Sequence, residues 1–216
     1  MGTDSYDNLQ VIVHCRERNG LEETMKLVIA SDIHGSAKWC REVMNVIERE
    51  APDKVVLLGD LLYHGPRNPL PDEYAPAEVA AMLNGVADRI VSVRGNCEAE
   101  VDQVMLQFPC MADYAWIVDG PHQLYCTHGH LREPGSLPPL PNGTAFVYGH
   151  FHVRKNEAWT PCICVTPEAW DSPKTAFIAR GCILTVSSRS LIWGNGVWGS
   201  VPFSRLVLRI GCEQWR

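Results

Sequence analysis

The sequence predicts an α/β fold, because short apolar runs alternate with amphipathic helical stretches and each run ends in a polar motif. The first run begins at Met25, in MKLVIASDIHG, and is typical of a strand that leads directly into a glycine-containing turn. A helix is expected over residues 36–50, because Val43 and Ile47 recur at helical spacing and Pro52 marks the exit. The run KVVLLGD then predicts a second strand.

The alternation continues along the chain. A proline-rich loop, HGPRNPLPDEYAP, leads to a helix expected over about residues 76–87 and then to the strand RIVSVRGN. A short helix is expected over about residues 98–106. The runs YAWIVD, QLYCTHGH and TAFVYGHFH predict further strands with little helix between them, which favours a second, more antiparallel sheet. One domain with its own core suits a chain of 216 residues.

Composition limits the classes of partner. With 19 basic and 25 acidic residues the net charge is -6, so we expect no broad basic surface for nucleic acid. No run reaches the length that spans a bilayer, and the first residues are not organised as a signal peptide, so we expect a cytoplasmic protein without a membrane partner. The nine cysteines are odd in number and irregularly spaced, which favours reduced thiols.

Five polar motifs, DIH, GD, RGN, THGH and GHFH, each follow an apolar strand. Open α/β sheets place ligand sites at these strand ends, so we expect the motifs to meet at one rim. Taken singly, each motif is more often an ordinary turn. Alternate residues of an extended segment point the same way, so D-x-H and H-x-H can each present two ligands together. The motifs predict a two-metal site made by Asp32, His34, Asp60, Asn96, His128, His150 and His152.

Two cations would lower the pKa of a shared water, so that a hydroxide forms near neutral pH. Asp60 is the carboxylate expected to bridge the two ions. Arg94 is the candidate that stabilises negative charge on a bound substrate, with Arg67 behind it. Either arginine could equally form a surface ion pair.

The chain resembles the calcineurin-like metallophosphoesterase superfamily and, within it, the YfcE-type bacterial phosphodiesterases. The resemblance covers about residues 25–152, through DIHGS, GDLLYHGPRN, VRGNCEAEVDQ, THGH and GHFH. It implies a four-layer αββα sandwich and a hydrolase in which a metal-bridging hydroxide attacks the phosphorus of a small-molecule phosphodiester in line. It also implies a first metal held by Asp32, His34, Asp60 and His152, and a second held by Asp60, Asn96, His128 and His150. The resemblance favours manganese, while the ligand chemistry also accepts iron, zinc or cobalt.

The identity of the general acid is open. Many superfamily members carry a histidine directly after the metal-binding asparagine, where this chain has Cys97. His64 or His130 could replace that histidine. Either could instead fix a loop or a neighbouring ligand by hydrogen bonding.

The chain departs from the family pattern after His152. A proline and an NPGS turn are expected there, but the chain reads VRKNEAWTPCICVTPEAWDSPK. Back-translation from the third base of the Val153 codon permits both features, so we predict that residues 154–216 are an out-of-frame product and that the second sheet is incomplete. A genuine divergent extension is the alternative. Because the resemblance starts at Met25, residues 1–24 are predicted to be an over-annotation or a flexible extension.

Two other functions compete with the phosphodiesterase. One is a catalytically inactive, frame-shifted product that keeps the ligands and loses the fold around them. The other is a scaffold, as in the retromer subunit that resembles these phosphoesterases but departs from the metal pattern at the GD and GN motifs. Asp60 and Asn96 stand at those two motifs here, which favours the enzyme. A homo-oligomer is left open.

Overall fold

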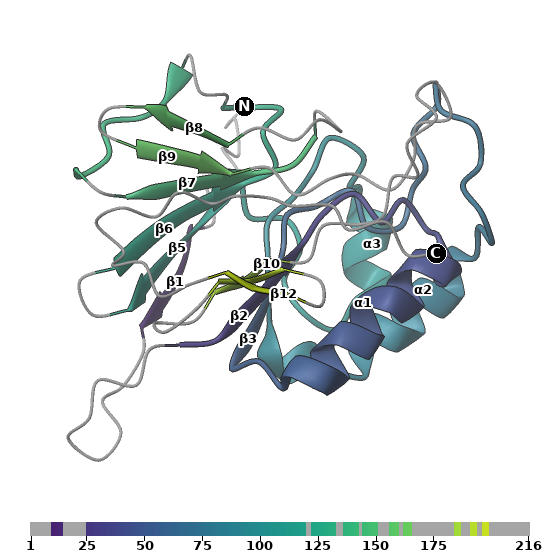
Figure 1. Ribbon diagram of the computed structural model, residues 1–216. Helices are drawn as coiled ribbons and strands as arrows, with labels where there is room; N and C mark the ends of the chain where they lie inside the picture. The colour runs from purple at the N-terminus through teal and green to yellow at the C-terminus, as the bar shows by residue number, and fades with distance from the viewer. Residues whose placement is uncertain are drawn as a thin grey trace, which may run out of the picture.

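The computed structural model describes side chains within residues 25–119, 123–132, 136–142 and 144–150, and outside them only the backbone of several strands. Three layers are visible in Figure 1: a layer of helices, a central sheet and a second sheet stacked on it. The helices among the described residues are α1 (Ala37–Glu50), α2 (Pro76–Asn84), the short 3-10 helix η1 (Ala87–Arg89) and α3 (Glu100–Met105).

The first sheet has the strand order β12-β11-β10-β2-β3-β4. Its parallel half comprises β2 (Leu27–Ala30), β3 (Lys54–Leu57) and β4 (Ile90–Ser92). Antiparallel to β2 lies β10 (Leu184–Val186), followed by β11 (Leu191–Trp193) and β12 (Gly196–Trp198). The predicted strand–helix–strand alternation from Met25 onwards is therefore confirmed, with boundaries within a few residues of those expected.

The second sheet is mixed, with the strand order β1-β5-β6-β7-β9-β8. Its strands are β1 (Gln10–His14), β5 (Tyr114–Asp119), β6 (His122–Thr127), β7 (Ala145–Tyr148), β8 (Asn156–Trp159) and β9 (Cys162–Val165). The backbones of β8 and β9 pair at its edge. The incompleteness of this sheet stays a prediction, because only the backbone of these strands is described. A fourth, helical layer over this sheet is not among the elements that the structure describes.

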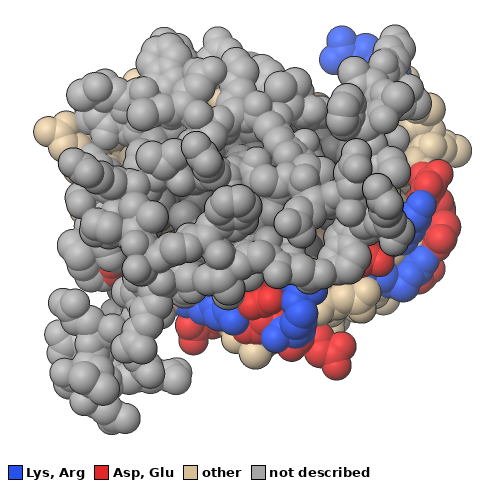
Figure 2. Space-filling model, viewed as in Figure 1, with Lys and Arg blue, Asp and Glu red and all other residues tan. Residues whose placement is uncertain are grey.

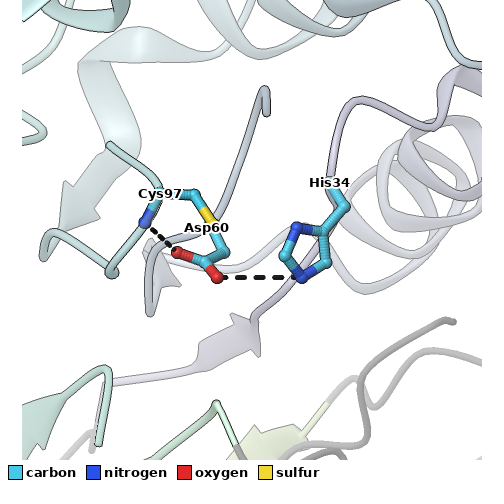
Figure 3. Close-up of side chains that lie close together, drawn as sticks. All are labelled: His34, Asp60 and Cys97. Atoms are coloured by element: carbon cyan, nitrogen blue, oxygen red, sulfur yellow. Dashed lines mark hydrogen bonds and ion pairs between the residues drawn. The ribbon is translucent and has the colours of Figure 1, made fainter. Parts of the chain in front are cut away.

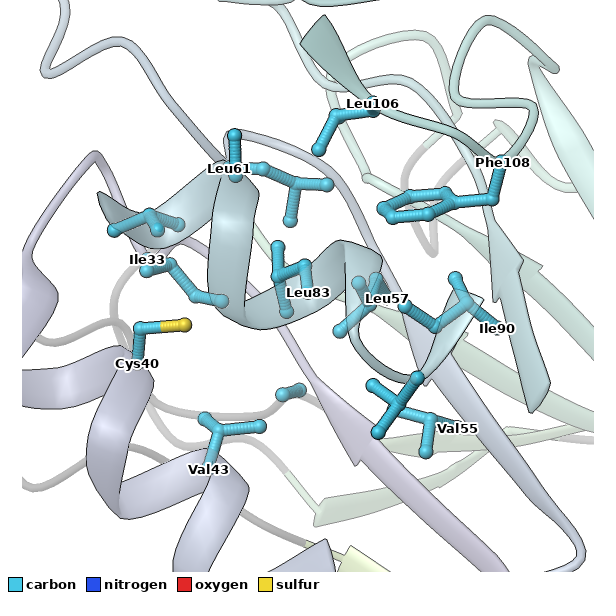
Figure 4. Packing of buried hydrophobic residues seen from close by; sticks show 14 of the residues in the cluster. Ile33, Cys40, Val43, Val55, Leu57, Leu61, Leu83, Ile90, Leu106 and Phe108 are labelled. Atoms are coloured by element: carbon cyan, nitrogen blue, oxygen red, sulfur yellow. The ribbon is translucent and has the colours of Figure 1, made fainter. Parts of the chain in front are cut away.

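Local sequence explains the helix that precedes the site. Ser36 caps α1 by accepting a hydrogen bond from the Trp39 backbone N–H, and the helix ends where Ala51 turns left-handed at φ 44°. Its buried face consists of Ala37, Cys40, Val43 and Ile47. This face packs with α2 on the first sheet, as Figure 4 shows for part of the cluster.

The strand β2 is buried on both faces, as expected for a parallel strand between two layers. Val28 and Ala30 face the helices, while Leu27 and Ile29 face the second sheet. Residues of the second sheet that meet this second face are Ala115, Ile117, Leu124, Cys126, Ala145 and Val147. The two packed layers hold the strand ends of both sheets close together, and the site is built there.

No helix in the described part of the chain has the length and apolar character needed to cross a membrane. Basic and acidic side chains alternate over α1 and α2 on the face shown in Figure 2. Arg41, for example, pairs with Glu73 and Glu78. The described charges on this face therefore form no single-sign patch, in agreement with the composition.

Candidate metal centre

The predicted ligands of the first sheet lie on loops just beyond its parallel strands. Asp32 follows β2, Asp60 follows β3 and Asn96 follows β4. Main-chain pairing continues past the strands, since the Asp32 N–H donates to Gly59 O at 3.0 Å and the His34 N–H donates to Asp60 O at 2.8 Å. The two loops are therefore fixed to each other by backbone geometry.

The predicted ligands of the second sheet lie beyond two adjacent parallel strands. His128 directly follows β6 and His150 follows β7, and the Gly149 N–H donates to His128 O at 2.8 Å. Their rings lie 5.1 Å apart. Six of the seven predicted ligands therefore meet at one rim, and the seventh, His152, lies outside the described residues.

The backbone at these ligands is strained. In the part of the chain that the structure describes, six non-glycine residues have positive φ, and four of them are predicted ligands. Those four are Asp32 at 57°, His34 at 52°, Asp60 at 54° and His150 at 72°. Such conformations cost about 1–3 kcal/mol each and persist where the surroundings enforce them, which is typical of functional sites.

Asp60 is the centre of the arrangement. Its Oδ2 lies 3.7 Å from His34 Nε2 and 3.4 Å from His128 Nε2, and Figure 3 shows it facing His34. Asp32 Oδ1 lies 3.7 Å from His34 Nε2. Asp60 belongs to two groups whose ligand atoms fall within 4.8 Å of one another: His34, Asp60 and Cys97, and Asp32, Asp60 and His128. A carboxylate that belongs to both groups has the position expected of a ligand that bridges two cations.

Hydrogen bonds to the backbone orient the rings of two histidines. His128 Nδ1 lies 2.7 Å from Leu58 O, and His34 Nδ1 lies 2.8 Å from Tyr63 O. Since a carbonyl oxygen only accepts, each Nδ1 carries the hydrogen and each Nε2 faces the carboxylates. Outer hydrogen bonds of this kind orient metal-binding histidines in proteins.

The donor set fits divalent cations. The buried carboxylates of Asp32 and Asp60 meet two buried imidazoles, and the exposed Asn96 contributes an amide oxygen 3.1 Å from His128 Nε2. Mixed oxygen and nitrogen sites of this kind accept manganese, iron, zinc and cobalt. A bound cation also offsets the cost of two carboxylates that are out of water.

Further hydrogen bonds hold the two carboxylates, and sequence reasoning missed them. Ser31 Oγ donates to Asp32 Oδ2 at 2.5 Å, and the His150 N–H reaches the same oxygen at 3.2 Å. The Cys97 N–H donates to Asp60 Oδ1 at 2.9 Å (Figure 3). Backbone donors leave no trace in residue identity, so no sequence signal could have found two of these three bonds.

Glu98 is a further group that sequence reasoning missed, although it lies inside the motif VRGNCEAEVDQ. Its carboxylate accepts backbone N–H groups from Asp60 at 2.9 Å, from Leu61 at 2.7 Å, and from Gly95. Burial and the negative charge of Asp60 raise the pKa of Glu98 to about 7. The sequence signal that could have identified Glu98 is its position two residues after the predicted ligand Asn96.

The His128–Asp60 pair controls protonation at the centre. Burial alone would lower the pKa of His128, but its hydrogen bond to Asp60 and the charges of Asp32 and Asp60 raise it to about 9. Burial would raise the pKa of Asp60, but the hydrogen bond and charge of His128 lower it below its ordinary value. In the metal-free protein at neutral pH, His128 is therefore cationic and Asp60 anionic.

Metal binding should release the proton of His128, because only the neutral imidazole can be a ligand. The raised pKa means that the proton is present below about pH 9. The apparent affinity for Mn²⁺ should therefore increase about tenfold per pH unit up to that value. Calorimetric titration in buffers of different ionisation enthalpy measures the release, and His64→Asn serves as a control. A pH-independent affinity without proton release would contradict this prediction.

A cavity of about 260 Å³ opens beside the metal ligands. It is lined by the predicted ligands His34, Asp60, Asn96 and His150, by Cys97, and by the loop of residues 65–68. This loop carries Arg67, the cationic side chain among the lining residues, which is exposed and has no ion pair among the described residues.

Arg94 occupies a different position. Its Nε donates to Asp113 Oδ1 at 2.8 Å in a half-buried ion pair, and the residue does not line the cavity. This is the ion-pair interpretation that the sequence left open for either arginine. A role for Arg94 at the phosphate stays a prediction, and the cavity favours Arg67 for that role.

The three candidates for the general acid differ in their surroundings. His64 packs edge-on against Tyr63 and Tyr74, with ring centroids 4.7 and 5.2 Å away, and does not line the cavity. Burial and the charges of His128, Arg94 and His150 lower the pKa of His130 to about 4, so its imidazole is neutral at pH 7. Burial and the charge of Asp60 raise the pKa of the Cys97 thiol, which stays protonated in the cavity wall. The identity of the acid stays open.

Comparisons with known proteins agree with this geometry. Phosphodiesterase YfcE of Escherichia coli is 47% identical over 129 residues, which is 60% of this chain and 70% of that protein. A solved structure of Yfce, a phosphoesterase from E. coli, has a TM-score of 0.72 at 40% identity and covers 77% of this chain and 91% of that one. Vacuolar Protein Sorting 29 from Cryptosporidium parvum has a TM-score of 0.53 at 12% identity, covers 78% of this chain and 89% of that one, and shares the fold alone.

The model of the calcineurin-like phosphoesterase superfamily domain matches residues 25–189. The match starts at Met25 and continues past Val153. The side chains of residues 1–24 and 154–216 are outside the described part of the chain. Only the backbone of strands is described in these two ranges. The predictions of an out-of-frame tail and of an N-terminal over-annotation therefore stay predictions. By the extent of this match, the chain belongs to the calcineurin-like phosphoesterase superfamily.

Proposed function

We propose that this member of the superfamily is a phosphodiesterase that depends on two divalent cations, with manganese as the favoured ion. One observation supports the proposal most: Asp60 is shared by two ligand groups and lines a cavity beside them. The sequence identity between the chain and phosphodiesterase YfcE favours the diester over the monoester as substrate.

The residues of the site would have three roles: binding the cations, orienting the imidazoles and binding the phosphate. Asp32, His34, Asp60, Asn96, His128, His150 and His152 would hold the two cations, which when bound supply Lewis acidity and neutralise phosphate charge. The backbone carbonyls of Leu58 and Tyr63 keep two of the imidazoles oriented. Arg67, which lines the same cavity, would bind a non-bridging phosphate oxygen and stabilise the charge that develops in the transition state.

The shape of the cavity limits the substrate. About 260 Å³ is close to the lower end of ligand pockets, about 300 Å³, which suits a phosphate with one small ester group. A second ester group would extend over Pro66 and Asn68, which are exposed. We therefore propose a small-molecule phosphodiester rather than a nucleic acid, in line with the net charge of -6.

Replacing Arg67 by alanine should lower kcat/KM for the diester about tenfold or more, because a cationic donor to the phosphate is lost. Protein stability should change little, since the side chain is exposed. Steady-state kinetics with an aryl phosphodiester and saturating Mn²⁺ measures the effect. Arg49→Ala is the matched control, because Arg49 lies in the last turn of α1, at the opposite end of that helix from the site. Equal kcat/KM in the two variants would remove Arg67 from the proposed mechanism.

Hydrolysis of the aryl phosphodiester tests the function itself. Treatment with a chelator should abolish the activity, and addition of Mn²⁺ should restore it. Folded, metal-loaded protein without activity would reject the phosphodiesterase and leave the scaffold or the inactive product. The fold likeness to Vacuolar Protein Sorting 29 does not by itself favour the scaffold, because one fold serves several functions.

A further inference from the structure

We propose that Glu98 is a positioning residue that holds the loop carrying Asp60 against the loop carrying Asn96, and so sets the metal-binding geometry. This inference rests on the proposed metal site. Glu98 does not line the cavity and belongs to neither ligand group, so it does not act on the substrate directly.

Both oxygens of the Glu98 carboxylate are used by backbone donors. Oε1 accepts from the Leu61 N–H at 2.7 Å, and Oε2 accepts from the Asp60 N–H at 2.9 Å and from the Gly95 N–H. Two of these donors belong to the loop after β3 and one to the loop after β4. A single side chain therefore ties together the two loops that carry Asp60 and Asn96.

The two loops are in close contact at the point that Glu98 ties. A Cβ on Gly59 would lie 2.2 Å from Gly95 N, and a Cβ on Gly95 would lie 2.0 Å from Asp60 Oδ1. The Cys97 N–H also donates to Asp60 Oδ1 at 2.9 Å. The segment 95–98 therefore contacts Asp60 in two ways. Cys97 binds the Asp60 side chain, and Glu98 binds the Asp60 backbone N–H.

The strain at Asp60 explains why such a tie is needed. Its φ of 54° is unfavourable for a non-glycine residue and has to be enforced by neighbours. A carboxylate beside Asp60 is itself electrostatically unfavourable, since like charges repel. The three backbone hydrogen bonds offset that repulsion, which gives Glu98 a specific reason to occupy this position.

The test compares Glu98→Gln with Asp102→Asn. Asp102 is a suitable matched control because it is a neighbouring, buried acid that also accepts a backbone N–H, from Ala99 at 2.8 Å, but it caps α3 and ties no metal loop. In Glu98→Gln, the new amide group would point a donor at backbone donors. We expect Glu98→Gln to bind Mn²⁺ about 10–100-fold more weakly than the wild type, and Asp102→Asn to bind within about twofold of it.

Calorimetry measures the Mn²⁺ affinity, and thermal unfolding of the metal-free proteins measures the loss of stability. Unchanged affinity in Glu98→Gln, with stability lowered as in Asp102→Asn, would overturn the proposal. Failure of the wild type to bind Mn²⁺ would count against the proposed function instead, so the two failures are distinguishable.

Amide hydrogen exchange tests the tie without metal. In the metal-free wild type, the amides of Asp60, Leu61 and Gly95 should exchange slowly, and in Glu98→Gln they should lose protection together. Fast exchange at these three amides in the wild type would overturn the proposal, even if Glu98→Gln does not fold.

Discussion

Replacing Asp60 by asparagine is expected to lower the Mn²⁺-dependent kcat/KM by about a thousandfold or more, because the shared carboxylate is the ligand through which two cations are held together. The amide has nearly the same shape and can still accept the Cys97 N–H on its oxygen. Its other atom becomes a donor that faces His34 and His128 and cannot be a ligand. The loss should therefore appear as lost metal binding rather than lost folding.

Two measurements separate these effects. Calorimetry should show that Asp60→Asn binds less Mn²⁺, and thermal unfolding should show a cooperative transition. Asp72→Asn is the matched control, because Asp72 is an exposed carboxylate that pairs with Lys38 and does not line the cavity. If Asp60→Asn retained more than about a tenth of the wild-type kcat/KM, the bridging role would be rejected.

Replacing Gly95 by alanine is expected to destabilise the protein by about 3 kcal/mol or more, because the added methyl group overlaps atoms that cannot move. The new Cβ would lie 2.0 Å from Asp60 Oδ1 and 2.6 Å from Asp60 N. The Asp60 side chain could only escape by leaving the ligand group, and its backbone is held by Glu98. For a domain of this size, we expect the melting temperature to fall by roughly 6–12 °C.

Gly85→Ala is the matched control for this steric argument. Gly85 follows α2 with φ -62°, which any residue adopts, and its Cβ would meet Met82 O at 3.2 Å and Ala81 O at 3.9 Å. We expect a change of less than about 1 kcal/mol. Chemical denaturation of both variants gives the two free energies of unfolding. Equal values would show that the loops after β3 and β4 are not pressed together as the structure has them.

Local sequence patterns determined the elements of the parallel half of the fold. The helical spacing of Val43 and Ile47, with Pro52 at the exit, predicted α1, and the apolar runs ending in DIH, GD and RGN predicted β2, β3 and β4. Each of these signals lies within the element that it predicts. The convergence of the motifs also followed from sequence, because parallel strands end at the same edge of a sheet.

The tertiary structure decided which side chains support the site. Arg67 follows the GD motif and Arg94 begins the RGN motif, so both are near strand ends in the sequence. Only the folded chain pairs Arg94 with Asp113, while Arg67 lines the cavity. The ring orientation of His128 depends on Leu58 O, which is 70 positions away in the chain. No local pattern encodes such a contact.

Sequence by itself therefore determined the kind of chemistry, through the residue types Asp32, Asp60 and His128 and their places after strands. Only the tertiary structure decided the protonation of these groups and the role of Glu98. The physical reason is that pKa values and hydrogen-bond partners depend on burial and on charges brought together from separate loops. The burial and the short distances between these charges arise only when the two sheets have packed.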